Sequence, residues 1–222
     1  MEKTVVFSRH GLTLMPQRAV WSAPRRTLWI ADLHLGKAAG FRAHGQPAPH
    51  GTTEENLRRL DELIALTSPE RFVVLGDFLH ARESRSPILL NRLRAWRRAY
   101  LSMDCVVVRG NHDRRAGDPP PDCGFVCVDE PAIVSDVESR HYPLTEDAAH
   151  SEGGPVLCGH IHPVVRISGP ARDRLRLPCF AVIGRQVILP AFGEFTGGSW
   201  IDPKAFNEIY LTTETTVHRY QP

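Results

Sequence analysis

The first half of the chain alternates short apolar runs with amphipathic stretches, and this order constrains the fold more than any other feature. The runs TLWIA (27–31), RFVVLG (71–76) and CVVVRG (105–110) are typical of buried strands. Between them, residues 53–67 and 88–101 repeat apolar side chains at helical spacing, and Thr52 with Glu55 predicts a capping box before the first helix. Alternating strands and helices predict a parallel sheet in an α/β protein.

The second half is predicted to be mostly β. Its strand-like runs are GFVCV (124–128), PVLCG (155–159), VVRIS (164–168), RLRLPCFAVIG (174–184), RQVILPAFG (185–193) and EIYLTTETTVHRY (208–220). Because each apolar sheet face must be covered, we expect two sheets packed face to face with helices outside, in one domain spanning residues 1–222. The polar segment 138–155 is predicted to be a mobile loop.

Charge and cysteine content narrow the class of protein. The chain has 27 Lys and Arg against 25 Asp and Glu, a net charge of +2, which is far from the basic excess of a DNA-coating protein. Its five cysteines form no C-x-x-C pair, and reduced thiols in the cytoplasm are expected. No apolar stretch approaches the ~20 residues of a membrane span, and we expect neither secretion nor membrane insertion.

Polar side chains follow several of the predicted strands, at the point where each strand ends. Ligands of an α/β sheet gather beyond the carboxyl ends of its strands, so these side chains should meet at one edge. They are Asp32 and His34 after the first run, Asp77 after the second, Asn111 and His112 after the third, and His160 and His162 after PVLCG.

In this order the blocks resemble the motif series of the calcineurin-like metallophosphoesterase superfamily, D-x-H, G-D, G-N-H-D/E, H and G-H-x-H. They stand here as Asp32-Leu33-His34, Gly76-Asp77, Gly110-Asn111-His112-Asp113, an intervening histidine, and Gly159-His160-Ile161-His162. The resemblance implies a four-layer α/β/β/α sandwich that carries two divalent metal ions.

The resemblance also implies a ligand set. One metal falls to Asp32, His34 and His162, the other to Asn111, His160 and the intervening histidine, and Asp77 bridges the two. Both His141 and His150 are available for the intervening position, and His141 is preferred because it precedes Tyr142-Pro143. Mixed nitrogen and oxygen ligands favour Mn, Fe or Zn over Ca or Mg.

The mechanism implied by the superfamily is in-line attack on phosphorus by a hydroxide held between the metals. His112 matches the histidine that gives a proton to the leaving alkoxide. Asp113, adjacent in the same block, is expected to orient His112 and hold it protonated.

Further segments resemble the DNA-ligase-associated metallophosphoesterase family of bacteria, which is linked to DNA repair. They are LHLGK (33–37), FR (41–42), GTT (51–53), FLH (78–80), LPAFG (189–193) and FTGG (195–198). This resemblance implies a manganese-dependent phosphodiesterase that acts as a DNA endonuclease, with a DNA ligase or helicase as a possible partner.

Several residues near the blocks are candidates to hold flanking phosphates of DNA, although surface, capping or ligand-supporting roles are open alternatives. They are Lys37, Arg42, His80, Arg114 and Arg115. Phe41, Phe78 and Phe192 are candidates for base stacking or for the core.

Two alternatives to a DNA endonuclease follow from the same residues. A phosphodiesterase or phosphatase for small substrates such as cyclic nucleotides would use the same metal site, and the low net charge favours it. A scaffold that had lost catalysis would lack some ligands, whereas all are present here. The oligomeric state and the strandedness of the DNA are left open by the sequence.

Overall fold

Two β-sheets lie face to face in the computed structural model, which describes residues 5–7, 10–168 and 174–221. The first sheet has seven strands in sequence order, antiparallel from β1 to β4 and parallel from β4 to β7. They are β1 (Val5–Phe7), β2 (Leu12–Met15), β3 (Ala19–Ser22), β4 (Thr27–Ile30), β5 (Arg71–Leu75), β6 (Asp104–Val108) and β7 (Val126–Val128).

The second sheet has nine strands and is mixed. Its main path is β14-β11-β12-β13-β10-β9-β8, and β15 pairs with both β12 and β16. The strands are β8 (Ala132–Val134), β9 (Val137–Ser139), β10 (Val156–Cys158), β11 (Pro163–Ser168), β12 (Arg174–Ile183), β13 (Gln186–Ile188), β14 (Ser199–Trp200), β15 (Glu208–Thr212) and β16 (Val217–Tyr220). Strands β9, β10 and β13 are mutually parallel, so the ends of β9 and β10 point the same way.

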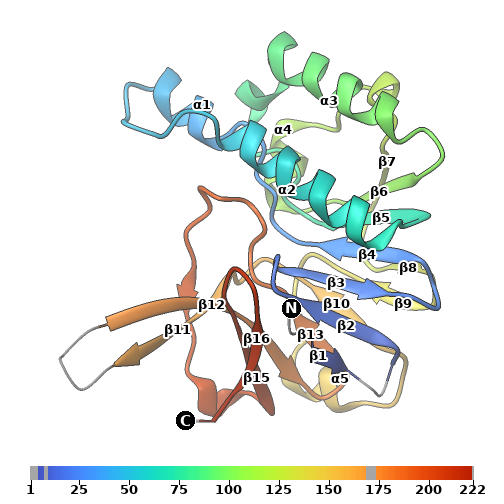
Figure 1. Cartoon of the computed structure of the whole chain (residues 1–222), viewed down its shortest axis with the longest axis vertical. Helices are drawn as coiled ribbons and strands as arrows, with labels where there is room; N and C mark the ends of the chain where they lie inside the picture. The colour runs from blue at the N-terminus through green and yellow to red at the C-terminus, as the bar shows by residue number, and fades with distance from the viewer. Residues whose placement is uncertain (1–4, 8–9, 169–173, 222) are drawn as a thin grey trace.

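Helices cover the outer sides of the sheets (Figure 1). Four of them lie over the first sheet and the short α5 lies beyond the second, which confirms the predicted α/β/β/α sandwich. The helices are α1 (Lys37–Ala43), α2 (Thr52–Thr67), α3 (Pro87–Ala99), α4 (Asn111–Ala116) and α5 (Glu146–His150), with single 3-10 turns at Arg82–Arg85, Pro121–Cys123 and Pro203–Ala205.

Two apolar layers hold the sandwich together. One lies between the helices and the first sheet and includes Phe72, Phe78, Trp96 and Phe192. The other lies between the two sheets, where Trp29 is fully buried and donates a hydrogen bond from Nε1 to Ser139 Oγ at 3.2 Å. Because a buried indole N–H needs a partner, this bond fixes the two sheets relative to one another next to the ends of β4 and β9.

Two local predictions are wrong. Helix α2 has Gly51, not Thr52, as its N-cap, and no side chain caps it, because Gly51 adopts a left-handed conformation with φ of 78°. Segment 138–155, predicted to be a mobile loop, contains the end of β9 and helix α5. Its polar composition predicts a loop, but two of its polar side chains, Ser139 and His141, are buried.

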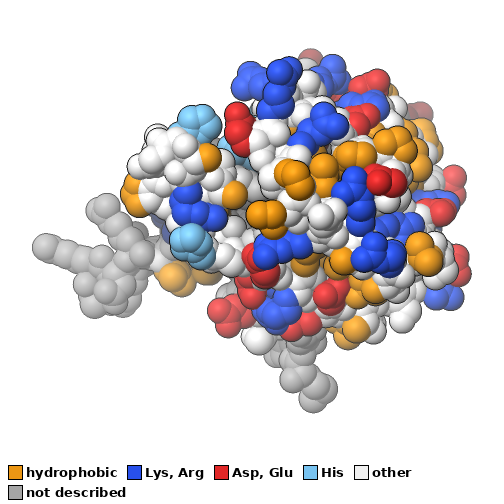
Figure 2. Space-filling view, turned by 90° about the horizontal axis from the view of Figure 1, so that it is seen from above, with side chains coloured by type: hydrophobic (Ala, Val, Ile, Leu, Met, Phe, Trp, Pro, Cys, Tyr) orange, Lys and Arg blue, Asp and Glu red, His pale blue; other side chains and the backbone are white. Residues whose placement is uncertain are grey.

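Charged side chains of both signs are mixed over the helical face (Figure 2). Arg58 is paired with Glu55 and Glu62, and Arg92 is paired with Glu54. These pairs indicate a solvated face with little net field. All five cysteines are free, and none of the helices in the described ranges is long and apolar enough to cross a membrane.

Candidate metal centre

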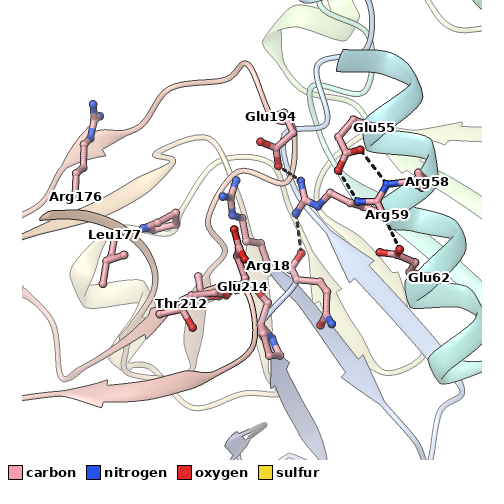
Figure 3. Close-up of a pocket in the computed structure, with 14 residues that line it drawn as sticks. Arg18, Glu55, Arg58, Arg59, Glu62, Arg176, Leu177, Glu194, Thr212 and Glu214 are labelled. Carbon is pink, nitrogen blue, oxygen red and sulfur yellow. Dashed lines mark hydrogen bonds and ion pairs between the residues drawn. The ribbon is translucent and has the colours of Figure 1, made fainter. Parts of the chain in front are cut away.

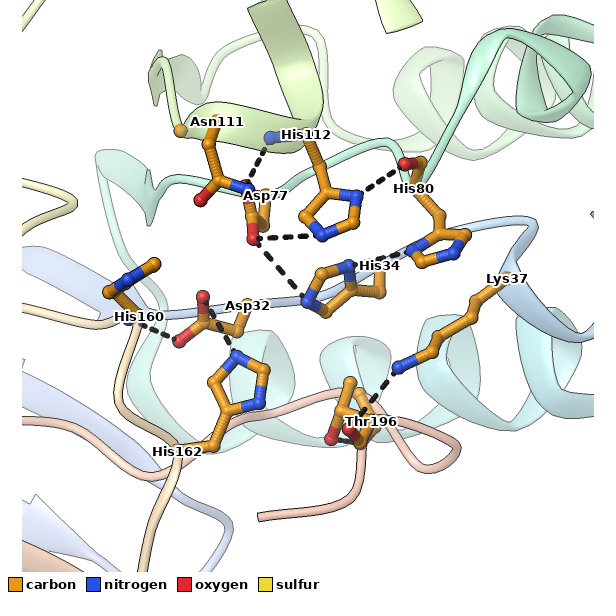
Figure 4. Close-up of polar contacts among 12 residues, drawn as sticks. Asp32, His34, Lys37, Asp77, His80, Asn111, His112, His160, His162 and Thr196 are labelled. Carbon is orange, nitrogen blue, oxygen red and sulfur yellow. Dashed lines mark hydrogen bonds and ion pairs between the residues drawn. The ribbon is translucent and has the colours of Figure 1, made fainter. Parts of the chain in front are cut away.

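The predicted ligands meet at one edge of the sandwich, where strands of both sheets end (Figure 4). The first sheet supplies residues after β4, β5 and β6, and the second supplies residues after β9 and β10. They are Asp32 and His34 after β4, Asp77 after β5, Asn111 at the start of α4 after β6, His141 after β9, and His160 and His162 after β10.

The backbone at these positions is strained in a way that points the side chains inward. Ten non-glycine residues of the described chain have positive φ, and five of them are predicted ligands: Asp32, His34, Asp77, His160 and His162. A left-handed residue costs free energy unless its surroundings hold it there, and such residues cluster at functional sites. Each one turns the chain sharply at a strand end, which brings a short polar side chain to the shared edge.

Two glycines of the motifs are required by close approach. A Cβ atom on Gly76, which has φ of 79°, would overlap the His141 ring, and one on Gly110 would overlap the Asp77 carboxylate. The glycines of G-D and G-N-H therefore leave room for ligands that arrive from other strands. The two glycines can be identified from the sequence, but the side chains for which they leave room are identified only in the tertiary structure.

Each residue of the first group of predicted ligands, Asp32, His34 and His162, has one side-chain atom with no hydrogen-bond partner among the described residues. Asp32 Oδ1, His34 Nε2 and His162 Nε2 are buried and unpartnered, and the ligand atoms of this group lie within 4.8 Å of one another. His162 Nε2 is 3.3 Å from Asp32 Oδ1, although the two atoms are not in hydrogen-bonding geometry. Buried polar atoms without partners are rare in proteins and commonly mark an ion site.

The second group satisfies itself through its own hydrogen bonds. His141 Nε2 lies 3.0 Å from Asn111 Oδ1 and 3.1 Å from His160 Nδ1. His141 is fully buried and lies 3.6 Å from Asp77 Oδ1 and 3.8 Å from Asp32 Oδ1. His150, the alternative for the intervening position, is exposed on α5 and bonded to the Glu146 carbonyl oxygen of its own helix.

Three imidazoles of the site have their Nδ1 atom engaged, which leaves Nε2 facing the cluster. His34 Nδ1 is 3.2 Å from His80 Nδ1, and His141 Nδ1 is 3.2 Å from the Leu75 carbonyl oxygen. His112 Nδ1 is 2.7 Å from the His80 carbonyl oxygen. An imidazole that donates an N–H from Nδ1 and is otherwise neutral keeps its lone pair on Nε2, and this is the tautomer that a metal ligand requires.

The pKa shifts also suit metal ligation. Burial lowers the pKa of His34, with a smaller effect of Lys37, so the imidazole stays neutral and keeps its lone pair. Burial raises the pKa of Asp77, and the nearby Asp32 adds to the rise. Asp32 and Asp77 are neighbouring buried carboxylates, and a divalent ion between them would offset their negative charge.

The donor set therefore fits two divalent ions. The predicted ligands offer imidazole nitrogen, amide oxygen and carboxylate oxygen, and three of these ligand atoms are buried without partners among the described residues. This combination suits Mn, Fe or Zn. A separate group, His34, His80 and His112, also brings three imidazoles within ligand distance of one another. His34 belongs to both groups, and its Nδ1 is already bonded to His80.

The predicted contact between Asp113 and His112 is wrong. The Asp113 carboxylate accepts hydrogen bonds from the backbone N–H groups of Phe78, Leu79 and Gly110 at 2.9 to 3.2 Å. It ties the chain after β5 to the chain after β6, and the His80 carbonyl oxygen orients His112 instead. Adjacent residues at the start of a helix point in different directions, so adjacency in the sequence does not predict a contact between Asp113 and His112.

Of the five residues predicted to contact substrate, the structure brings two to the cluster. His80 stacks on His112 with ring centroids 4.6 Å apart, and Lys37 donates a hydrogen bond from Nζ to the Thr196 carbonyl oxygen at 3.2 Å. Arg42 bonds to carbonyl oxygens of its own loop, Ala48 and Pro49.

The other two, Arg114 and Arg115, are exposed on α4, beyond the turn that carries His112. Arg114 lies 3.8 Å from the Asp129 carboxylate. Among the three candidate aromatics, Phe78 and Phe192 are buried in the core, whereas Phe41 is half-buried next to His80 and Phe195.

Two neighbours of the cluster were not foreseen. The exposed ring of Tyr142 lies 4.5 Å, centroid to centroid, from His160. The loop of Phe195 and Thr196, which follows β13, reaches Phe41 and Lys37 on α1. The sequence motif FTGG lies in this loop but does not indicate which residues the loop contacts, because its contacts depend on how the two sheets are joined.

Comparison with known proteins agrees with this geometry. Residues 25–186 match the model of the calcineurin-like phosphoesterase family. A crystal structure of the Pseudomonas putida nuclease MPE is 40% identical over 95% of this chain and 96% of the other, with a TM-score of 0.80. No curated protein matches the chain.

A second solved structure, that of the phosphoesterase Yfce from E. coli, is 13% identical over 83% of this chain and 86% of the other. Its TM-score of 0.36 is too low to bear on the fold or the site. The family match covers most of the chain and includes every block from Asp32 to His162. On this match and on the arrangement of its buried ligands, the chain is a member of the calcineurin-like phosphoesterase family, whose members are metal-dependent phosphoesterases.

Proposed function

We propose that this phosphoesterase is a manganese-dependent phosphodiesterase that cuts DNA internally, in the cytoplasm, as part of DNA repair. The observation that carries the proposal is the set of three buried ligand atoms without partners next to Asp77, on Asp32, His34 and His162. The likeness to a nuclease over nearly the whole chain supports DNA as the substrate. A DNA ligase or helicase of the same repair pathway is the partner that we propose.

The first ion is assigned to Asp32, His34 and His162, and the second to Asn111, His141 and His160, with Asp77 between them. The full burial of His141 and the exposure of His150 support the choice of His141. When bound, such ions activate a water molecule as the nucleophile and neutralise charge on the phosphate.

His112 is assigned the proton donor to the leaving oxygen. Its Nδ1 is held by the His80 carbonyl oxygen, and its Nε2 lies 4.0 Å from Asp77 Oδ2, so Nε2 faces the space next to the cluster. The side chain is 28% exposed, which leaves Nε2 within reach of a substrate. Asp113 acts indirectly, because it holds the backbone that carries His112.

Lys37 and His80 are assigned to the substrate phosphate, since both lie at the cluster. Burial lowers the pKa of His80 to about 4, which makes its imidazole a neutral hydrogen-bond partner. The half-buried Arg42 and the exposed Arg114 and Arg115 are assigned to phosphates farther along the DNA, where guanidinium groups add salt-dependent affinity.

The test uses covalently closed circles of single-stranded DNA, which have no ends, so that any cut is endonucleolytic. Metal-stripped protein is incubated with the circles with and without Mn²⁺, in parallel with hydrolysis of bis(p-nitrophenyl) phosphate. We expect linear DNA only with Mn²⁺. His112→Ala should slow DNA cleavage by about 10²- to 10⁴-fold, the usual size of general acid catalysis.

The small diester separates the role of His112 from that of the ions. Because p-nitrophenolate leaves without a proton, His112→Ala should affect its release far less than it affects DNA cleavage. His150→Ala, an exposed histidine on α5, is the matched control and should behave as wild type. Intact circles together with active hydrolysis of the small diester would exclude an unaided nuclease and favour small diesters as substrates.

A further inference from the structure

Strands β11, β12 and β14 present an exposed indole and two arginines on one face. The register pairs Val164 with Trp200 and Arg166 with Arg176. Because side chains alternate along a strand, Trp200, Arg166 and Arg176 project from the same side of the sheet. Trp200 is 60% exposed, and the Arg166 guanidinium carbon lies 5.8 Å from the centroid of its ring. In Figure 1 the β11–β12 hairpin extends away from the body of the molecule.

The opposite face of the same hairpin is apolar and packs inward. Val165 is buried there, and Ile167 and Leu177 pack against the same apolar cluster. The hairpin therefore uses this face for folding, while Arg166 and Arg176 on the other face, together with Trp200 of β14, are exposed to solvent. A large exposed aromatic side chain between cations is not needed by the fold.

Arg176 also lines a recess of about 730 Å³ between α2 and β12, together with Arg58 and Arg59 (Figure 3). In the recess, Arg58 and Arg59 point toward Glu55, Glu62 and Glu194 and are paired with them. In the described residues no carboxylate pairs with Arg166 or Arg176, and Arg176 donates only to the Gly198 carbonyl oxygen.

The face begins next to the metal centre. Ser199 N donates to the carbonyl oxygen of His162, a predicted ligand, at 2.9 Å, and Ser199 pairs with Pro163. Trp200 pairs with Val164, the next residue of β11, which lies two residues beyond His162, or about 7 Å along the strand. A base on the indole would therefore belong to a nucleotide close to the phosphate at the metal centre.

We propose that Trp200, Arg166 and Arg176 bind unpaired nucleotides that flank the phosphate being cut, an inference that rests on the proposed nuclease function. The indole would stack on a base, and the two guanidinium groups would contact phosphates. Stacking of this kind requires a base whose face is free, which a base pair inside a duplex does not offer. The surface therefore selects single-stranded DNA or an unpaired segment.

The test measures binding of a fluorescein-labelled thymidine oligonucleotide by anisotropy, with Mn²⁺ and in the His112→Ala protein so that the DNA stays intact. Trp200→Ala should weaken binding about 5- to 150-fold, the usual effect of losing one stacked base. Trp200→Phe, which keeps a stacking ring, should retain most of the affinity. Leu175→Ala is the matched control, since Leu175 is 55% exposed on the opposite face of the hairpin.

The arginines are tested by salt dependence. Replacing both with glutamine (Arg166→Gln, Arg176→Gln) should lower the slope of log Kobs against log salt by about 1.4, since each phosphate contact on a single strand contributes about 0.7. Hydrolysis of bis(p-nitrophenyl) phosphate by Trp200→Ala in an otherwise wild-type chain should stay unchanged, which shows that the metal centre is intact.

The outcomes separate this inference from the proposed function. Equal affinities of the Trp200→Ala and Leu175→Ala proteins, while wild type still cuts circles, would overturn the inference and leave the nuclease in place. Equal binding of duplex and single-stranded DNA would also overturn it. Binding that depends on Trp200 in a protein that never cuts circles would support the inference and overturn the proposed function.

Discussion

The two groups of ligands at the metal centre come from the same edge of the sandwich but differ in how their polar atoms are satisfied. On one side, Asp32 Oδ1, His34 Nε2 and His162 Nε2 have no hydrogen-bond partner. On the other side, His141 Nε2 is shared between Asn111 Oδ1 and His160 Nδ1. The first group keeps three buried ligand atoms available to an ion, whereas the second group uses its ligand atoms in hydrogen bonds to one another.

This difference has an energetic consequence. A metal entering the first group relieves buried atoms whose desolvation is uncompensated, and no bond must break. A metal entering the second group must displace two hydrogen bonds, each worth about 1 kcal/mol net. We therefore expect the two sites to fill in order, with the group of Asp32, His34 and His162 first.

Removing the carboxylate between the two groups should have the largest effect. Asp77 lies 3.5 Å from His34 Nε2 through Oδ2 and 3.6 Å from His141 Nε2 through Oδ1, so it faces both groups. We expect Asp77→Asn to lower kcat/KM for bis(p-nitrophenyl) phosphate by about 10³-fold or more, which corresponds to several kcal/mol of lost metal catalysis. Activity within tenfold of wild type, in a protein with an unchanged circular dichroism spectrum, would contradict a role that joins the groups.

The order of filling is tested next by titrating metal-free protein with Mn²⁺ in a calorimeter. Wild type should bind in two steps that differ by about 10- to 100-fold in affinity, the equivalent of the two displaced hydrogen bonds. His162→Ala should remove the tight step and His160→Ala the weak one, while His150→Ala changes neither. A single step of uniform affinity, or loss of the tight step in His160→Ala, would reverse our comparison.

The smallest expected effect is that of Asp77→Asn on the free energy of unfolding, and its sign should depend on whether Mn²⁺ is present. In metal-free protein, burial and then the neighbouring Asp32 raise the pKa of Asp77 above 3.8, so the stability contributed by the protonated form is lost as the pH rises through the folded-state pKa. Asp77→Asn removes that charge and should stabilise the metal-free protein at pH 7 by about 1 kcal/mol. With Mn²⁺ bound, Asp77→Asn should destabilise the protein instead.

Urea unfolding at pH 7, with and without Mn²⁺, measures both signs. The difference between the metal-free proteins should shrink as the pH is lowered through the raised folded-state pKa of Asp77, where the wild-type carboxyl becomes protonated. If Asp77→Asn destabilised the metal-free protein at pH 7, its hydrogen bond from the His112 N–H, at 2.9 Å, would outweigh the cost of the buried charge.

The motif residues were predictable because each block combines a strand end with a polar residue, which is a local pattern. The strands β4, β5 and β6 lie where apolar runs indicated them, and Asp32, Asp77 and Asn111 follow them directly. Helices α2 and α3 begin and end within a few residues of their predicted bounds. These features depend on periodicity within a short window, which a single sequence contains.

Contacts between blocks were less predictable. The sequence could not show that Asp113 binds the backbone after β5, that His80 orients both His34 and His112, or that segment 138–155 brings a buried histidine to the site. Each of these depends on which strand ends are neighbours in space. In the sequence, His141 is favoured over His150 because it follows an extended segment and precedes Tyr142-Pro143, whereas in the structure burial separates the two residues clearly.

The sequence alone determined the family, the two-sheet architecture and the set of residues proposed to hold metal, since these follow from ordered local motifs and apolar periodicity. The tertiary structure decided which of those atoms are paired and which are left without partners among the described residues, where the Trp200 face lies relative to His162, and which groups face each histidine nitrogen. The reason is physical: hydrogen-bond satisfaction and burial are properties of the three-dimensional neighbourhood, and residues far apart in the chain create it.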